Sequence, residues 1–335
     1  MKKNKFYFLA IFLFVINAGC ASERLYVRVA DNEGKPVSNA VVRVGFSTSN
    51  VLFGGGHSSR SKSGLAQAKT DTEGNAVVKF NCKNASFGWD VEADGYYRSN
   101  SRREQFKFDE VIVPPCFVKV VLHEHEKHGS VILWKKKNPQ PMYAHGDYYE
   151  EDLHEPPEDN GRYGFDMMKY DWLPPYGKGE VADFYFVRQI GEPVSDGVWG
   201  KIEFSNKSGI YIGKQTGCKS FPSTYQADTN AVFKSNIPFI FNHTDKGEKG
   251  ISFKDIINAG EYGVMRTRVV CDGDGNVVKA NYSKVLGPFR FGEWRGKWVL
   301  YTPGAVFNPR VNDSNLESDP KRSYDPKLKR PLLAP

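Results

Sequence analysis

The sequence predicts an all-β protein, with two antiparallel β-sandwich domains following a cleaved signal peptide. Short runs of alternating apolar and polar residues recur along the chain, clusters of turn residues separate them, and only one short segment has a helical character. We divide the chain into a signal peptide (1–21), a first sandwich (22–126), a second β-rich domain (127–307) and an extended, proline-rich, charged tail (308–335).

The first residues have the pattern of a secretory signal peptide. Three lysines precede a largely apolar run from Phe6 to Ala18, and small residues follow. The run is too short to cross a bilayer of about 30 Å. Cys20 stands where a bacterial lipoprotein carries its lipid, but Asn17 is unusual for that motif, so lipidation of Cys20 and ordinary cleavage near Ala21 are both open. We expect an exported protein, periplasmic, secreted or on the cell surface, that contacts a membrane only through a lipid at Cys20.

The charge of the chain is modest. Without Lys2, Lys3 and Lys5 the net charge falls from +7 to +4 over a chain of 335 residues. For an exported protein this balance argues against a nucleic-acid partner. We therefore expect the partner to be a protein or a glycan of the cell envelope.

Four cysteines besides Cys20 predict two disulfides, because an even number in an oxidising compartment tends to pair. The sequence alone leaves three connectivities open. The domain division favours Cys82 with Cys116 and Cys218 with Cys271. Each pair would close a loop worth about 4 kcal/mol by the chain-entropy argument.

The first domain begins with a strand in which Leu25, Val27 and Val29 alternate with polar residues. The turn residues "DNEGKP" and a second strand from Val41 follow. A second hairpin is predicted in "AKTDTEGNAVVKFNC", and "WDVEADGYYRS" and "FVKVVLHEH" have the alternation of further strands. This pattern is typical of an antiparallel sandwich.

Three segments in this domain, "GKPVSNAVVRV", "TDTEGNAVV" and "VEADGYY", resemble the successive signatures of the carboxypeptidase regulatory-like, or prealbumin-like, β-sandwich domain. The resemblance covers about a third of the chain, and the sequence departs from the pattern by a Gly/Ser-rich insertion, "STSNVLFGGGHSSRSKSGLAQ". It implies an accessory module for folding, presentation or adhesion, and it brings no catalytic residues.

The second domain resembles no family that we recognise. Strand signals recur in "GEVADFYFVRQ", "GKIEFS", "GIYIG", "AVFKSNIPFIFNH" and the hairpin "GVMRTRVVCDGDGNVVKANYS". "SFKDIINAG" has the composition of one short helix closed by Gly260. The acidic segment "DYYEEDLHEPPED" cannot bury a core and is expected to be a loop. From Asn308 the chain loses apolar periodicity, so we expect a tail that is loose or lies on the surface.

The stretch "HEHEKH" raises the question of a metal site. On an extended strand His123 and His125 point to the same side, about 7 Å apart, a separation that Zn²⁺ or Cu²⁺ can bridge. The sequence favours a polar strand end that leads into a domain linker over a metal site, so we expect no cofactor. "CDGDGN" likewise favours a hairpin turn over a calcium loop, because Val277 and Ser283 stand where that loop needs Gly and an acidic residue.

Aromatic residues are concentrated in the second domain and are the candidates for a ligand face. Each is interpreted either as a core residue or as an exposed ring that contacts a sugar or a protein. These residues are Trp172, Tyr176, Trp294 and Trp298.

These observations favour a non-catalytic exported envelope protein with a structural, adhesion or assembly role. The alternative is a carbohydrate-binding protein that uses exposed aromatics of the second domain. A hydrolase that uses paired carboxylates is the third hypothesis, since such pairs cannot be seen without their separation.

Overall fold

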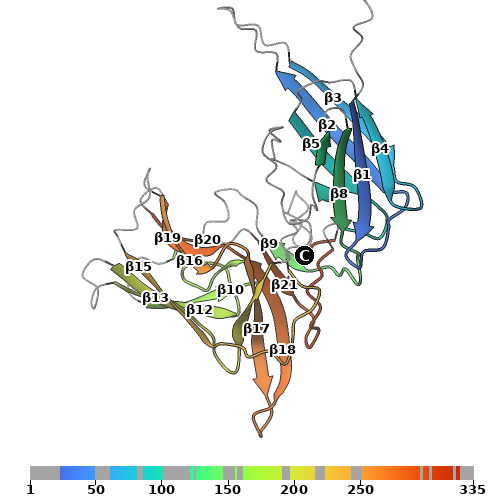
Figure 1. Ribbon diagram of the computed structural model, residues 1–335. Helices are drawn as coiled ribbons and strands as arrows, with labels where there is room; N and C mark the ends of the chain where they lie inside the picture. Colours follow the sequence, from blue (N-terminus) through green and yellow to red (C-terminus); the bar gives the residue numbers. More distant parts are fainter. Residues whose placement is uncertain are drawn as a thin grey trace, which may run out of the picture. The chain divides into compact units, whose positions relative to one another are not determined.

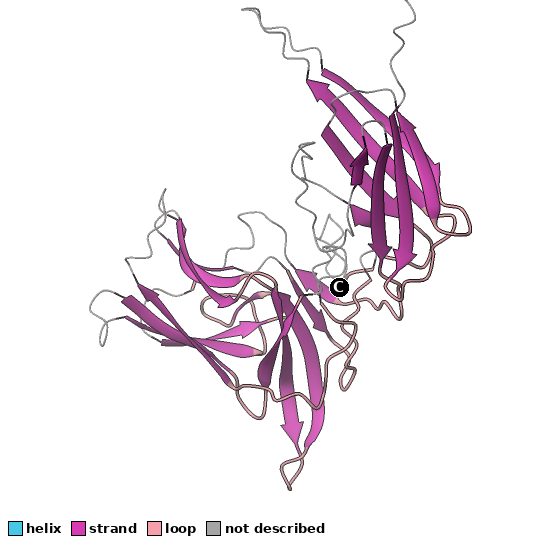
Figure 2. Ribbon diagram, viewed as in Figure 1, coloured by secondary structure: helices cyan, strands magenta, loops and turns pink. Residues whose placement is uncertain are grey.

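The computed structural model describes most of the chain in two compact units, Met1–Lys135 and Lys136–Pro335. The described residues contain strands and loops and no helix (Figures 1 and 2), which confirms the all-β prediction. None of them forms a helix long and apolar enough to cross a membrane. The described ranges are 23–49, 61–80, 86–100, 121–123, 126–145, 155–156, 161–190, 197–215, 223–242, 251–294, 297–301, 304–319 and 322–324.

The described residues of the first unit form two four-stranded sheets, ordered β4-β1-β8-β7 and β3-β2-β5-β6. Alternation in the strands places the apolar side chains of both sheets in one core, where Val29, Val42 and Val78 are almost fully buried. The strands are β1 (Glu23–Asp31), β2 (Val41–Ser49), β3 (Ser61–Lys69), β4 (Asn75–Phe80), β5 (Ser86–Glu92), β6 (Ser99–Asn100), β7 (Val121–His123) and β8 (Glu126–Leu133).

The boundary between the units lies later than the sequence predicted. Strand β8 pairs with β1 in parallel from Arg24 opposite Glu126 onward, and Val131 and Leu133 complete the first core. The first unit therefore runs to Lys135 instead of ending at residue 126. His123 pairs with Glu126 across the β7–β8 hairpin. His123 and the residues from Glu126 to His128 thus belong to paired strands of the first unit, and the boundary between the units follows Lys135.

Three hairpin turns in the two units share one design. In each, an aspartate side chain accepts the backbone N–H groups two and four residues ahead, and a glycine three residues ahead has a positive φ. This is the pattern of a tight turn closed by a left-handed glycine. The turns are Asp31–Lys35, Asp71–Asn75 and Asp272–Asn276. The last confirms that "CDGDGN" is a hairpin turn.

In the second unit the described strands form three sheets, with orders β11-β10-β12-β13-β15, β14-β17-β18-β21-β9 and β16-β19-β20. All three contribute to one large aromatic core that includes Phe165, Phe186 and Phe291. The strands are β9 (Tyr143–His145), β10 (Gly161–Asp166), β11 (Asp171–Trp172), β12 (Phe184–Ile190), β13 (Gly197–Glu203), β14 (Gly209–Lys214), β15 (Asn236–Asn242), β16 (Ile251–Ile257), β17 (Glu261–Cys271), β18 (Val277–Leu286), β19 (Phe289–Trp294), β20 (Lys297–Tyr301) and β21 (Ala305–Asn308).

The helix predicted in "SFKDIINAG" is wrong. These residues form most of strand β16 and the turn after it, and β16 pairs antiparallel with β19. Ile256 and Ile257 are buried in the large core. Gly260 has a φ of +84° in the turn that leads to β17. Tertiary pairing and burial therefore outweigh the local helical character of the segment.

The segment after Asn308 is more deeply packed than the predicted tail. Leu316 and Glu317 are 0% and 1% exposed. Leu316 fills a second, smaller core with Val264 and Tyr282, on the face of the β14-β17-β18-β21-β9 sheet that is turned away from the large core. Backbone hydrogen bonds fix it on both sides, from Leu316 N–H to the Tyr225 carbonyl and from Gln140 N–H to the Glu317 carbonyl. Leu316, the buried Glu317 side chain and these backbone hydrogen bonds together dock a segment that has no apolar period.

Candidate functional site

The predicted ligand-face residues of the second unit have different positions. Trp172 is 3% exposed and packs edge-on against Phe165, with ring centroids 5.1 Å apart, so it is a core residue. Tyr176 is 51% exposed. Trp294 and Trp298 lie in β19 and β20, and their side chains are outside the described part of the chain. Of the four candidates, the structure therefore places Tyr176 at the surface and Trp172 in the core.

The predicted metal and disulfide residues are largely outside the described ranges. His123 ends β7, whereas His125 is not described. Within the described ranges no three His, Cys, Asp or Glu side chains gather as a metal site. Cys271 forms no disulfide with a described residue. Cys20, Cys82, Cys116 and Cys218 are not described, so both disulfides and the lipid anchor stay predictions.

Tyr176 lies on a loop, residues 173–181, that two aspartate side chains hold in place. Asp171 accepts hydrogen bonds from the backbone N–H groups of Trp172 at 2.8 Å and Lys178 at 2.9 Å. Asp166 accepts from the N–H groups of Glu180 at 2.8 Å and Val181 at 3.1 Å. The second half of the loop is thereby fixed to the β10–β11 hairpin at Lys178, Glu180 and Val181.

The packing within this loop leaves little freedom. The N–H of Gly179 donates to the Trp172 carbonyl at 2.8 Å. A Cβ at Gly179 would come within 2.9 Å of that carbonyl oxygen and of the Asp166 Cβ, so the close approach requires glycine. The rings of Tyr176 and Tyr163 form a T-shaped pair with centroids 5.2 Å apart, and about half of Tyr176 is exposed to solvent. Tyr176 is therefore a half-exposed aromatic ring on a loop that hydrogen bonds hold in one conformation.

Behind the loop lies a buried ionic cluster of Asp166, Asp183 and Arg268. Both carboxylates are 0% exposed and the Arg268 side chain is 18% exposed. Arg268 donates to both oxygens of Asp183, at 2.9 and 3.0 Å, and to Asp166 at 2.8 Å. Such bidentate, charge-assisted contacts are the strong form of an ion pair.

A bulge in β17 directs Arg268 into this cluster. The register of β17 with β18 shifts between Thr267 and Val270, and Arg268 has a φ of +52°. A bulge inserts an extra residue and re-aims a side chain. The positive φ is costly for a residue other than glycine. The three hydrogen bonds of the guanidinium oppose that cost.

The two carboxylates titrate in opposite directions. Burial acts to raise the pKa of Asp166, but the backbone N–H groups of Glu180 and Val181 and the charge of Arg268 outweigh it, and the pKa is lowered. Burial raises the pKa of Asp183, and the guanidinium of Arg268 works against that rise. All four carboxylate oxygens accept hydrogen bonds, so the cluster is built to anchor the loop and the sheets.

The outward face of the β10-β12-β13 strands carries a second group of charged and aromatic residues. The Arg162 guanidinium lies 3.2 Å from the centroid of the Tyr185 ring and 3.2 Å from Glu203. Lys201 pairs with the same glutamate at 2.9 Å. These side chains are partly exposed and satisfy one another.

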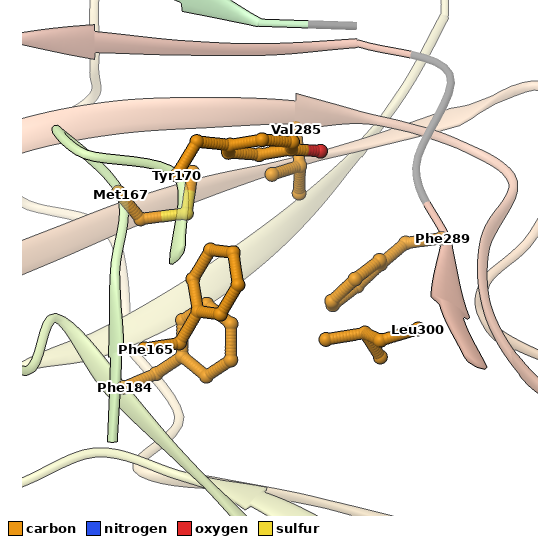
Figure 3. A pocket seen from close by; sticks show the side chains of 7 residues that line it. All are labelled: Phe165, Met167, Tyr170, Phe184, Val285, Phe289 and Leu300. Carbon is orange, nitrogen blue, oxygen red and sulfur yellow. The ribbon is translucent and has the colours of Figure 1, made fainter. Parts of the chain in front are cut away.

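Described residues of the large core line a small cavity of about 10 Å³, shown in Figure 3. This is room for about one water molecule, and the wall is apolar. The cavity is therefore a packing defect. Its wall is formed by Phe165, Met167, Tyr170, Phe184, Val285, Phe289 and Leu300.

Comparisons with known proteins give no family. No family model matches the chain, and no curated protein matches it. Among solved structures, the chain is similar to one described as a "putative carbohydrate binding protein" from Bacteroides uniformis, with 7% identity, 84% of this chain and 97% of that chain covered, and a TM-score of 0.16. Neither the fold nor the function of this chain follows from a TM-score of that size.

Sequence reasoning found Tyr176 but missed the cluster that fixes its loop. Asp166 and Asp183 lie 17 positions apart, and Arg268 is 85 positions beyond Asp183. No local spacing brings the three together. The one available signal was the position of Asp166 and Asp183 beside apolar strand residues, where an unpaired carboxylate is unfavourable.

Proposed function

We propose that this protein is a non-catalytic binding protein of the cell envelope, whose second unit binds a glycan through Tyr176. The observation that carries the proposal is the half-exposed Tyr176 ring on a loop held by Asp171 and Asp166. A ring fixed in this way loses little conformational entropy on binding. Its free side can pack against the C–H face of a sugar, and its hydroxyl can form a hydrogen bond.

The neighbouring groups support a polar ligand. Lys178, two residues from Tyr176, is exposed, and the carboxylate of Asp171 lies at the base of the same loop. Loops placed on a rigid sheet are common sites of recognition. The signal-peptide pattern at residues 1–21 supports export, which brings the chain to the glycans of the envelope.

The carboxylate hydrolase is less well supported. Asp166 and Asp183 lie together in the described part of the chain, but both are fully buried and both are hydrogen-bonded to Arg268. A glycoside hydrolase needs two carboxylates that flank an accessible scissile bond. Asp166 and Asp183 therefore have a structural role.

A glycan array probed with the full chain tests the proposal. We expect binding to a defined set of glycans, and Tyr176→Ala should weaken that binding about tenfold or more, as for an aromatic hot spot. Tyr324→Ala is the matched control, since Tyr324 is also a half-exposed tyrosine of the same unit. Binding that is unaffected by Tyr176→Ala would overturn the proposed site.

The array also separates glycan binding from adhesion or assembly through a protein partner. No glycan binding, together with crosslinking to an envelope protein that Tyr176→Ala abolishes, would favour the protein partner. Neither glycan nor protein binding at Tyr176 would reject this loop as a recognition site.

A further inference from the structure

Lys284 of β18 is buried, and its amino group has few hydrogen-bond partners to stabilise a positive charge. Its residue exposure is 1%, and its Nζ donates one hydrogen bond, to Ser223 Oγ at 3.0 Å. An ammonium group has three protons to donate, and Lys284 has no other hydrogen-bond partner among the described residues. Burial lowers the pKa of Lys284 to about 7, and the charge of Glu317 opposes this shift.

The C-terminal strap, defined here as residues 309–319, covers the face of the sheet on which Lys284 lies. It is docked by backbone hydrogen bonds from Leu316 to Tyr225 and from Asn312 to Ala280, at 2.8 and 2.7 Å. Leu316 is 0% exposed and packs with Val264 and Tyr282. Lys284 is paired with Val264 in the sheet, so the amine lies on the face that the strap covers.

The side chain of Glu317 fixes the strap to the segment at Lys137 and Asn138. Its carboxylate accepts the backbone N–H groups of Lys137 and Asn138, and the side chain is almost fully buried. The carboxylate is therefore engaged in holding the strap when Lys284 takes up a proton. Its field reaches the amine, but no hydrogen bond between Glu317 and Lys284 forms in the closed strap.

We propose that the strap is a releasable cover whose docking is weakened by the proton on Lys284. In the closed strap the amine is buried and has one hydroxyl partner among the described residues, so burial favours its neutral form over its charged form. In the open strap water solvates the ammonium. Protonation of Lys284 therefore favours the open state.

The pH range follows from this coupling. Below about pH 7 both states carry the proton, and the strap is at its loosest. From about pH 7 up to the ordinary lysine pKa of about 10.4, the open state alone holds the proton, so the opening constant falls about tenfold per pH unit.

Other titratable groups on this face do not account for such a change. Burial raises the pKa of Tyr211, Tyr262 and Tyr282, so these phenols stay neutral between pH 7 and 9. Arg266 is a charged group of this face, and its guanidinium lies 4.2 Å from the centroid of the Phe233 ring. Two further groups beside the strap are Tyr225 and Lys137, and the Nζ of Lys137 lies over the Tyr225 ring at 4.4 Å. The strap itself contributes Glu317.

Hydrogen exchange of the full chain tests the proposal. Protection factors of the amides of Asn312 and Leu316 are measured between pH 6 and 9, corrected for the intrinsic rate at each pH. We expect them to be level below pH 7 and to rise about tenfold per unit above it. In Lys284→Met the protection should be high and should not depend on pH. Lys279→Met, which removes an exposed lysine of the same strand, should behave as the wild type.

A second measurement does not depend on a variant. The ¹³Cε signal of Lys284 in lysine-labelled protein should titrate near pH 7, far below the exposed lysines. A Lys284 that titrates near 10, or wild-type protection factors that are level from pH 6 to 9, would overturn the proposal. An equal pH dependence in Lys284→Met and wild type would also overturn it, because another group would then control the strap.

Discussion

The guanidinium of Arg268 donates to both carboxylate oxygens of Asp183, at 2.9 and 3.0 Å, across a separation of 85 residues in the chain. The pair joins the bulge of β17 to the start of β12, and Asp183 is fully buried. A buried ion pair of this kind contributes little net free energy compared with an apolar pair. Removal of one of the two partners, however, leaves the other charge buried without a partner.

We therefore expect Arg268→Met to lower the free energy of unfolding by about 3–5 kcal/mol, because Asp166 and Asp183 would remain buried without their cation. Denaturant unfolding measures this loss. Arg162→Met is the control, since its ion pair with Glu203 is at the surface and should be worth about 1 kcal/mol or less. Equal effects in the two variants would contradict a special role for the buried cluster.

Acid should weaken the second unit through Asp166. The pKa of Asp166 is lower in the folded chain than in the unfolded chain, so its contribution is present above the unfolded pKa of about 3.9. It is lost as the pH falls through the folded pKa. We expect the wild type to lose its stability advantage over Asp166→Asn below about pH 4. Urea unfolding from pH 2 to 6 measures this. An advantage that is constant over the whole range would contradict the shift.

The conformation of the Tyr176 loop should depend on the Asp171 side chain, although that side chain is only partly buried. Asp171→Ala removes the acceptor of the Trp172 and Lys178 N–H groups, and we expect a loss of about 1 kcal/mol in stability. Because the loop would then be less ordered, ligand affinity should fall as well. Asp228→Ala removes a similar turn contact, to the Asn230 N–H, on another loop. It should leave ligand affinity unchanged.

Two glycines in equivalent turns should respond differently to substitution. Gly34 and Gly74 have φ values of +82° and +78°, so alanine at either position costs about 1–2 kcal/mol from the left-handed backbone. A Cβ at Gly34 meets nothing within 4 Å, whereas at Gly74 it would overlap the Val29 carbonyl oxygen. Thermal unfolding should therefore show a clearly larger loss for Gly74→Ala than for Gly34→Ala. Similar losses would mean that the β1 backbone moves aside at low cost.

Residues close in the sequence made most of the strands and turns predictable. Alternation in Leu25, Val27 and Val29 sets the buried face of β1, and the spacing of Asp272 and Gly275 is enough to build a turn. The failures have a common cause. In "SFKDIINAG" and in the segment around Leu316, pairing and burial against distant strands decided the conformation, and local composition carries no record of them.

The candidate site was predictable only in part, because local composition does not show which side chains distant strands will bury. The sequence identified Tyr176 as an aromatic beside two prolines, and it could not tell that ring from Trp172, four positions earlier, which is buried.

By itself, then, the sequence determined the β class, the turns and the list of candidate aromatics, because these depend on residues a few positions apart. The tertiary structure alone decided which ring is displayed, that a cluster of Asp166, Asp183 and Arg268 fixes its loop, and that Lys284 is enclosed beneath a strap. These relationships join residues far apart in the chain, and only the folded backbone sets their distances.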